Sequence, residues 1–240
     1  MFCVPAPRVE LLRLLPKGGT VAEIGVQRGV FSQSILDIVQ PERLHLIDPW
    51  AQQTQGDYLA DPSNVDDERH ADHLAHVRTQ FAEPIATGQV TLHRAFSQDV
   101  VDGFADGGFD WIYIDGDHTF DAVARDLALY APKIAPGGLI LGHDYNNSPP
   151  FRDQGRFGVV EAVNAFVADN DWEFVCLNME MAATYVLARK PLAGAAELFA
   201  LRLLRNVPLL FEVRDFPQSG YQTRDVDFPD GFRRQFPSFG

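Results

Sequence analysis

Short apolar runs and amphipathic stretches alternate along most of the chain. Apolar and β-branched runs predict seven β-strands, at residues 20–24, 44–47, 90–93, 111–114, 139–141, 174–177 and 184–187. Apolar residues recur with helical spacing over residues 8–15, 30–39, 120–130 and 159–167. This alternation is typical of an α/β fold, so we expect a seven-stranded, mostly parallel sheet with helices on both faces. Ligands of such sheets bind beyond the carboxyl ends of the strands.

Two regions of different composition follow one another along the chain. Residues 1–190 contain all the predicted strands and the whole acidic excess, whereas residues 191–240 hold equal numbers of acidic and basic residues. Residues 191–240 are rich in Phe and Pro and lose helical periodicity beyond Asn206. Because such a segment cannot form a core alone, we expect an irregular extension. It would wrap the body, cover an acceptor pocket or dock on a second copy, and we favour a homo-oligomer.

Composition excludes several classes of protein. A net charge of −13 disfavours a nucleic-acid partner, because binding phosphates requires exposed Lys and Arg. No run of about 18 apolar residues exists, so no membrane span is expected. Two cysteines are too few for a disulfide scaffold or a Cys-rich zinc site. The first 19 residues lack the pattern of a secretory signal, so the expected location is cytoplasmic.

A glycine turn follows the first predicted strand, in the sequence Glu23-Ile-Gly25-Val-Gln27-Arg-Gly29. Glycine lets a backbone approach a ligand closely, although an ordinary strand-to-helix turn would use it too. A dinucleotide-binding fingerprint would need glycine at positions 25, 27 and 30, where Gln27 and Val30 break the pattern. The turn therefore argues against a nucleotide-cofactor oxidoreductase, the main competing enzyme class on a similar sheet.

Acidic and histidine residues follow two later strands. Asp115-Gly-Asp117-His118 comes directly after residues 111–114, and His143-Asp144 follows residues 139–141. If these strands are neighbours in a parallel sheet, both groups meet at one edge. Carboxylates with an imidazole beside them would make a divalent-metal site with open positions. The alternative is that the acids cap helices and His143 is structural.

The glycine turn resembles the first motif of class I S-adenosylmethionine (SAM) methyltransferases. That resemblance implies a Rossmann-like fold in which Glu23, Gly25 and Gly29 accommodate the methionine part of SAM. It also implies that Asp48, at the end of the second strand, binds the ribose, and that Ser97 lies near the adenine. Asp48 and Ser97 could instead cap a helix or turn. A SAM-binding module without catalysis is a further alternative. The acids and histidines at residues 115–118 and 143–144 argue against it, because binding alone would not need them.

Residues 18–190 resemble more narrowly the Mg²⁺-dependent O-methyltransferases that tailor macrolide and aminocoumarin sugars. The resemblance includes Gly158-Val-Val-Glu-Ala-Val-Asn-Ala-Phe166. It implies that Asp115, His143 and Asp144 hold the metal and that His118 is the catalytic base. Position 143 departs from the family's acid, and a nitrogen ligand favours Mn²⁺, Fe²⁺ or Zn²⁺ over Mg²⁺. Alternatively, His143 lies outside the metal shell and acts on the substrate.

The chemistry implied is an in-line transfer of the SAM methyl group to a small-molecule hydroxyl, such as that of a sugar or secondary metabolite. Positioning alone can lower the barrier of such a step by roughly 7–11 kcal/mol. Metal coordination makes a hydroxyl a better nucleophile, and a neutral His118 can take its proton. Asp115, His118 and His143 are therefore the expected catalytic residues, with Asp115 also in the cofactor pocket. N-methylation is not excluded by any residue.

Residues 50–80 are expected to cover the cofactor. Within them, His70, His73 and His76 recur at helical spacing beside several acids, which we interpret as a solvated helix face. Trp50 directly follows Asp48-Pro49 and packs either on a ligand or in the core.

Overall fold

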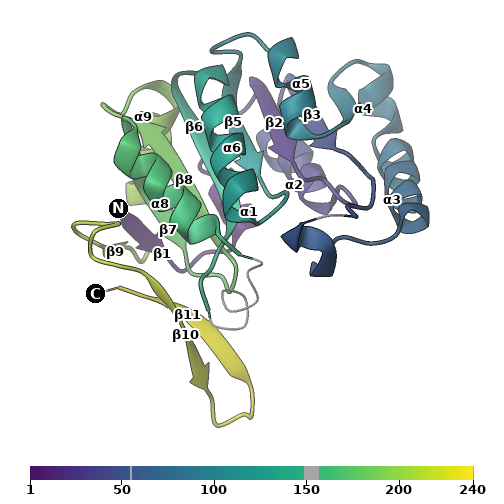
Figure 1. The fold of residues 1–240 in the computed structure, drawn as a ribbon. Coiled ribbons are helices and arrows are strands. Elements are labelled where there is room, and N and C mark those ends of the chain that lie inside the picture. The colour runs from purple at the N-terminus through teal and green to yellow at the C-terminus, as the bar shows by residue number, and fades with distance from the viewer. Residues whose placement is uncertain (55, 149–156, 240) are drawn as a thin grey trace.

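The computed structural model describes residues 1–54, 56–148 and 157–239. Eleven strands lie in this part of the chain. They are β1 (Phe2–Val4), β2 (Thr20–Ile24), β3 (Arg43–Asp48), β4 (Val90–Arg94), β5 (Phe109–Ile114), β6 (Ile134–Tyr145), β7 (Trp172–Asn178), β8 (Ala183–Arg189), β9 (Phe211–Glu212), β10 (Gln222–Asp227) and β11 (Arg233–Ser238). Nine of them form one sheet in the order β4-β3-β2-β5-β6-β8-β7-β1-β9 (Figure 1).

All seven predicted strands are confirmed, and the sheet is mostly parallel. Strands β2 to β6 run parallel to one another, whereas β8 is antiparallel to both β6 and β7. The sheet has nine strands rather than seven, because β1 pairs in parallel with the outer strand β7 and β9 then pairs with β1. These added strands are three and two residues long, too short to leave a periodic pattern in the sequence.

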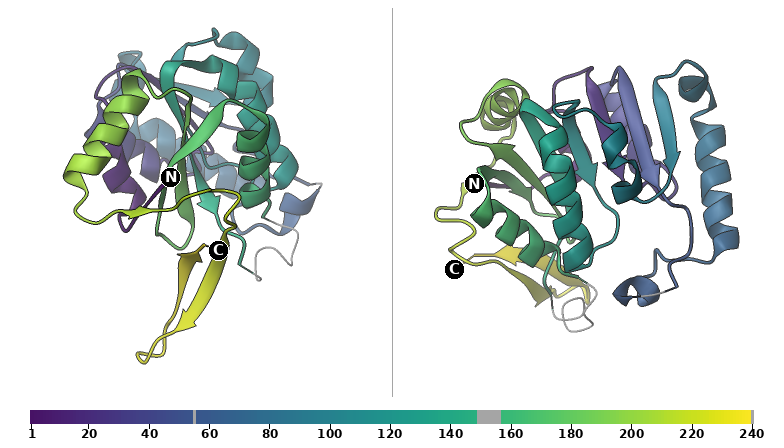
Figure 2. Two further views of the ribbon diagram at one scale, coloured as in Figure 1. Left: turned by 90° about the vertical axis from the view of Figure 1, so that its left-hand side faces the viewer. Right: turned by 45° about the horizontal axis from the view of Figure 1, so that its top comes forward.

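Helices cover both faces of the sheet, as predicted. The helices are α1 (Arg8–Leu12), α2 (Val30–Val39), α3 (Asp67–Gln80), α4 (Ala82–Ala86), α5 (Ser97–Val100), α6 (Phe120–Tyr130), α8 (Val159–Asp169) and α9 (Gly194–Asn206). Short 3₁₀ turns are η1 (Asp57–Ala60), η2 (Val101–Gly103) and η3 (Ala131–Lys133). Helices α1, α2, α3 and α9 pack into the core on one face, and α6 and α8 pack into the core on the other (Figure 2).

The C-terminal extension contains more regular structure than predicted. It begins with α9, whose Phe199 and Leu203 are buried in the core, and continues through β9 into the main sheet. Strands β10 and β11 then form a separate two-stranded hairpin that projects away from the body (Figures 1 and 2). Its base is fixed to the loop after β6, since Asn147 accepts a hydrogen bond from the backbone N of Thr223 at 2.9 Å.

None of the helices in the described residues has both the length and the apolar composition that crossing a membrane requires.

Candidate functional site

A cavity of about 710 Å³ opens at the carboxyl ends of β2, β3, β5 and β6. Four strands end here because the sheet is parallel in this region, and their loops form the walls. The cavity is lined by eight of the nine predicted site residues: Glu23, Gly25, Asp48, Ser97, Asp115, His118, His143 and Asp144. Gly29 is the exception. The volume lies within the range of small-molecule and cofactor sites.

The two glycines of the turn after β2 serve packing. Gly25 has a φ of +86°, and a Cβ there would lie 2.0 Å from the backbone oxygen of Asp115. Its lack of a side chain therefore lets the ends of β2 and β5 meet. Gly29 has a φ of +73°, and a Cβ there would lie 2.7 Å from Cε2 of Phe81. Gly29 therefore makes room for the Phe81 ring and does not line the cavity.

Asp48 holds the glycine turn in place. Its Oδ2 accepts hydrogen bonds from the backbone N of Val26 and of Gln27, both at 2.9 Å, and its Oδ1 accepts one from Trp50 at 2.7 Å. The carboxylate thus acts as the turn cap that the sequence left open as an alternative. It still faces the cavity, and carboxylate oxygens have lone pairs for further donors.

Glu23 is a buried carboxyl at the floor of the cavity. It is 1% exposed, and its Oε2 accepts a short hydrogen bond from the Ser32 hydroxyl. Burial raises the pKa of Glu23 to about 8, although the bond from Ser32 acts to lower it. Near neutral pH the side chain is therefore mostly protonated, and a cationic group arriving beside it would favour its ionised form.

Ser97 lies at the other end of the cavity, beside a second buried acid. The Ser97 hydroxyl donates to Oδ1 of Asp126 at 2.5 Å, and Tyr130 donates to the Ser97 carbonyl at 2.9 Å. Burial raises the pKa of Asp126 to about 6. Asp126 comes from α6 and was not predicted, because nothing in its sequence context distinguishes it from an ordinary helix residue.

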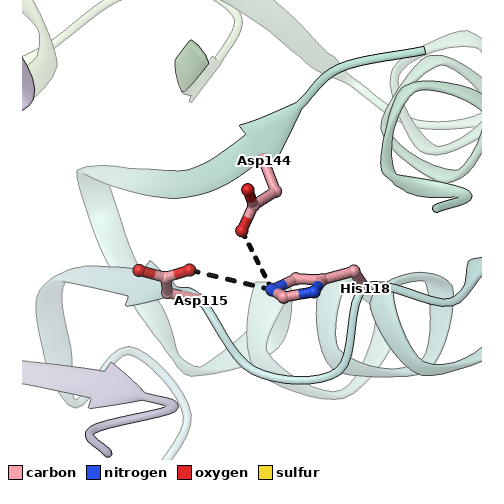
Figure 3. Close-up of side chains that lie close together, drawn as sticks. All are labelled: Asp115, His118 and Asp144. Atoms are coloured by element: carbon pink, nitrogen blue, oxygen red, sulfur yellow. Dashed lines mark ion pairs between the residues drawn. The ribbon is translucent and has the colours of Figure 1, made fainter. Parts of the chain in front are cut away.

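Three of the predicted residues converge on one point. Nε2 of His118 lies 2.9 Å from Oδ2 of Asp144 and 4.0 Å from Oδ1 of Asp115 (Figure 3). Ligand atoms of these three side chains all lie within 4.8 Å of one another. Nδ1 of His143 lies beside the same carboxylates, at 3.5 Å from Asp115 and 3.3 Å from Asp144. The two strand ends therefore meet as the sequence predicted.

The backbone at Asp144 is adapted to this arrangement. Asp144 has a φ of +56°, and the pairing of β6 with β8 shifts register between Gly142 and Tyr145. A left-handed conformation is unfavourable for most residues, but Asp tolerates it better than bulky side chains do. The irregularity turns the Asp144 carboxylate toward His118 (Figure 3), and such strain is common at functional sites.

The carboxylates control the charge of both histidines. Burial acts to lower the pKa of His118, but Asp144, Asp61 and Asp115 outweigh it and raise that pKa well above its ordinary value. Burial likewise opposes protonation of His143, yet Asp115 and Asp144 raise its pKa to about 9. The pKa of Asp144 is held well below its ordinary value by the two imidazoles, despite its burial.

Besides Asp126, two residues that contact the acid and histidine cluster were not predicted from the sequence. Asp61 follows η1 in the segment before α3, and its Oδ2 lies 3.4 Å from Nδ1 of His118. Arg8 begins α1, and its Nη1 lies 2.9 Å from Oδ2 of Asp115. The acidic composition of residues 50–80 was the only sequence feature that pointed to Asp61, and no sequence feature pointed to Arg8. His118 is thus flanked by carboxylates on both ring nitrogens.

Asp117 and Trp50 have structural roles. Oδ1 of Asp117 accepts a hydrogen bond from the backbone N of Thr119 at 2.9 Å, directly before α6. Trp50 is 1% exposed and belongs to the core, and its Nε1 donates to the Gln27 carbonyl at 2.8 Å. Of the two interpretations of Trp50, core packing is the one that these contacts fit.

The three histidines of α3 do not share one environment. His76 is exposed, His73 is half-buried, and His70 is 8% exposed and lines the cavity. The prediction of a solvated face is therefore wrong for His70. His70 lies in the first turns of α3, and its side chain faces the cavity.

The donor set can hold a divalent cation. Asp115 and Asp144 supply carboxylate oxygens, and a nitrogen ligand could come from His143 or from His118, both of which lie beside these carboxylates. Two carboxylates with imidazole fit Mn²⁺, Fe²⁺ or Zn²⁺ better than Mg²⁺, which prefers oxygen alone. Arg8 already neutralises one oxygen of Asp115, and Oδ1 remains directed toward the histidines.

Comparison with known protein families identifies the type of domain in this chain. A family model described as a methyltransferase domain matches residues 22–145, a range that includes the glycine turn and both acidic groups. No curated protein sequence matches the chain significantly.

Solved structures share the fold at low sequence identity. The O-methyltransferase TomG from Streptomyces achromogenes, involved in tomaymycin synthesis and solved with SAM, has a TM-score of 0.54 at 16% identity, over 78% of this chain and 81% of TomG. The N-methyltransferase NodS from Bradyrhizobium japonicum has a TM-score of 0.53 at 13% identity, over 75% and 92%. Spermidine synthase from Thermotoga maritima has a TM-score of 0.50 at 14% identity, over 84% and 62%.

Proposed function

Because the chain belongs to the class I SAM-dependent methyltransferases, we propose that it methylates a hydroxyl group of a small molecule with the help of a divalent cation. The observation that carries this proposal is the convergence of Asp115, His118 and Asp144 at the wall of the cavity. A sugar or secondary-metabolite hydroxyl is the acceptor class that the resemblance of the sequence implies.

The cavity offers separate places for the parts of SAM. Gly25 and Glu23 lie at the end of β2, Asp48 at the end of β3, and Ser97 with Asp126 beyond β4. We place the methionine part near Glu23, the ribose near Asp48 and the adenine near Ser97. The methyl group would then face the end of β5, where Asp115 and His118 lie.

His118 is the residue that accepts the hydroxyl proton while the acceptor oxygen forms its bond to the methyl carbon and the carbon–sulfur bond breaks. Only a neutral imidazole can do this, yet Asp144, Asp61 and Asp115 raise the pKa of His118. A divalent cation held by Asp115 and Asp144 would polarise the hydroxyl and offset the carboxylate charge that keeps His118 protonated. Asp61 and the ring of Phe157, stacked 4.8 Å from the His118 ring, fix the orientation of the imidazole.

The test combines ion binding with transfer. Mn²⁺ binding is measured by electron paramagnetic resonance in the presence of S-adenosylhomocysteine (SAH), for the wild type, Asp144→Asn and the control Asp121→Asn. Asp121 is exposed on α6 at the same cavity. We expect Asp144→Asn to lose Mn²⁺ binding while SAH binding and the control stay unchanged.

Transfer is measured with methyl-labelled SAM on paired panels of hydroxyl and amine acceptors, with and without chelator. We expect methylation of hydroxyls that chelator abolishes. Transfer to amines alone, or transfer to hydroxyls that persists in chelator-treated Asp144→Asn, would contradict the proposal.

A further inference from the structure

Arg8 reaches from the start of α1 into the cavity and is held there on several sides. Its Nη1 donates to Oδ2 of Asp115 at 2.9 Å and to the Tyr113 hydroxyl at 3.2 Å. Its Cζ lies 4.7 Å from the centre of the Phe31 ring, and its backbone N donates to Oε2 of Glu180 at 2.9 Å. The guanidinium is therefore fixed in position before any ligand binds.

Most of the hydrogen-bonding capacity of this guanidinium is unused. A guanidinium carries five N–H donors, and both hydrogen bonds above come from Nη1 alone. Nε and Nη2 have no partner among the described residues, although the side chain is only 29% exposed and lines the cavity. A fixed, partly buried guanidinium with two free nitrogens is suited to binding a planar anion such as a carboxylate.

The charge of the cavity makes such a cation necessary. Several acidic residues, among them Asp48, Asp61 and Asp115, line the cavity, and they disfavour a ligand carboxylate that no cation neutralises. The other arginines at the cavity are Arg28 and Arg125, and both are exposed. Arg125 adjoins Asp126 at the Ser97 end of the cavity.

Arg8 contacts the end of β5, whereas Ser97 follows β4, and strands β2 and β3 lie between β5 and β4 in the sheet. Its contacts, Phe31 in the first turns of α2 and Asp115 at the end of β5, stand on either side of the turn at Gly25. In the proposed function, this is the end that receives the amino-acid part of SAM. The carboxylate of that part needs a cation, and the other half-buried cations at the cavity, His118 and His143, already face Asp144 and Asp115.

We propose that Arg8 binds the α-carboxylate of SAM and makes the protein select SAM over its decarboxylated form. This inference rests on the proposed function, because it needs SAM in the cavity. It assigns to the N-terminal segment, which precedes the region matched by the methyltransferase model, a direct part in recognising the cofactor. Asp115 and Tyr113 position Arg8 for this task.

The test compares three ligands by isothermal titration calorimetry in the presence of chelator. SAH carries the carboxylate and the amine, decarboxylated SAH carries only the amine, and 5′-methylthioadenosine carries neither. The proteins are the wild type, Arg8→Met, Arg8→Lys and the control Arg13→Met. Arg13 is exposed, and it pairs with Glu10 on the surface.

We expect Arg8→Met to weaken SAH binding by about 10- to 100-fold, as for loss of a charged hydrogen-bonded pair. Binding of decarboxylated SAH and of methylthioadenosine should change by less than about threefold, and Arg8→Lys should recover part of the loss for SAH. Arg13→Met should bind all three ligands as the wild type does.

Two results would overturn the role of Arg8. An unchanged affinity of Arg8→Met for SAH would mean that the carboxylate binds elsewhere. An equal loss for all three ligands would mean that Arg8 acts through the packing of Tyr113 and Asp115. Failure of the proposed function is distinguishable, because a protein that does not use SAM would bind none of the adenosyl ligands as the wild type, and the acceptor and the cation are decided by the separate transfer assay.

Discussion

The buried carboxyl of Glu23 makes the stability of the fold depend on pH. Its pKa is raised from an ordinary value of about 4.5 to about 8 by burial. Below pH 4.5 the carboxyl is neutral in both the folded and the unfolded chain. Between pH 4.5 and pH 8 the unfolded chain ionises while the folded protein keeps its proton, so the free energy of unfolding falls as pH rises. Above pH 8 the loss is complete.

The perturbation is Glu23→Gln, which removes the ionisation and keeps an oxygen that can accept the hydrogen bond from Ser32. One pKa unit corresponds to about 1.4 kcal/mol. Relative to its value below pH 4.5, the free energy of unfolding of the wild type is therefore lower by about 3 kcal/mol at pH 7 and by about 5 kcal/mol above pH 8. For a chain of this size, 3 kcal/mol corresponds to about 6–12 °C in Tm. Because the amide of Glu23→Gln does not ionise, the variant should not undergo this loss of unfolding free energy as pH rises.

The assay is thermal unfolding of the ligand-free protein from pH 5 to pH 9, for the wild type, Glu23→Gln and the exposed control Glu42→Gln. The difference in Tm between Glu23→Gln and the wild type should widen from pH 5 to pH 8 and then stay constant. The readout is this pH slope, because any fixed cost of burying the amide is independent of pH. Parallel curves at all pH values would refute the reasoning, and the control should follow the wild type.

Two further predictions concern the other parts of the molecule. His118→Asn should lower the rate of methyl transfer by about 10²- to 10⁴-fold, the usual contribution of a general base, while calorimetry shows SAH affinity within about threefold of the wild type. The hairpin of β10 and β11 exposes Phe228 and Phe232, and isolated hairpins are marginal in water, so we propose that a second copy covers it. Light scattering should then show a dimer or larger oligomer that Phe228→Ser/Phe232→Ser dissociates, and an unchanged mass would contradict this role.

The sequence predicted the part of the site that lies next to strands. Asp48, Asp115 and the pair His143-Asp144 each directly follow an apolar run, and the carboxyl ends of parallel strands meet at one edge. Their convergence therefore follows from strand order alone. Seven strands of the sheet, β2 to β8, were predicted because each has enough residues to show a pattern in the sequence.

Residues that reach the site from elsewhere were not predictable. Arg8 and Asp61 lie far from Asp115 and His118 in sequence, and neither belongs to a local motif. Their positions depend on where α1 and the segment before α3 pack, which is a property of the whole fold. Strands β1 and β9 were missed for a related reason, since pairing with the outer strand β7 and with each other defines them.

The ligand-free site balances its own charges, and this decides what binding must displace. Arg8 and the protonated imidazoles of His118 and His143 face the carboxylates of Asp115, Asp144 and Asp61. In the proposed function, a cation held by Asp115 and Asp144 would make the proton on His118 unfavourable, because it would supply the positive charge that the proton supplies in the ligand-free site. Loss of that proton would leave His118 neutral and able to accept the hydroxyl proton. Under this proposal, cation binding and deprotonation of the base would therefore be electrostatically coupled.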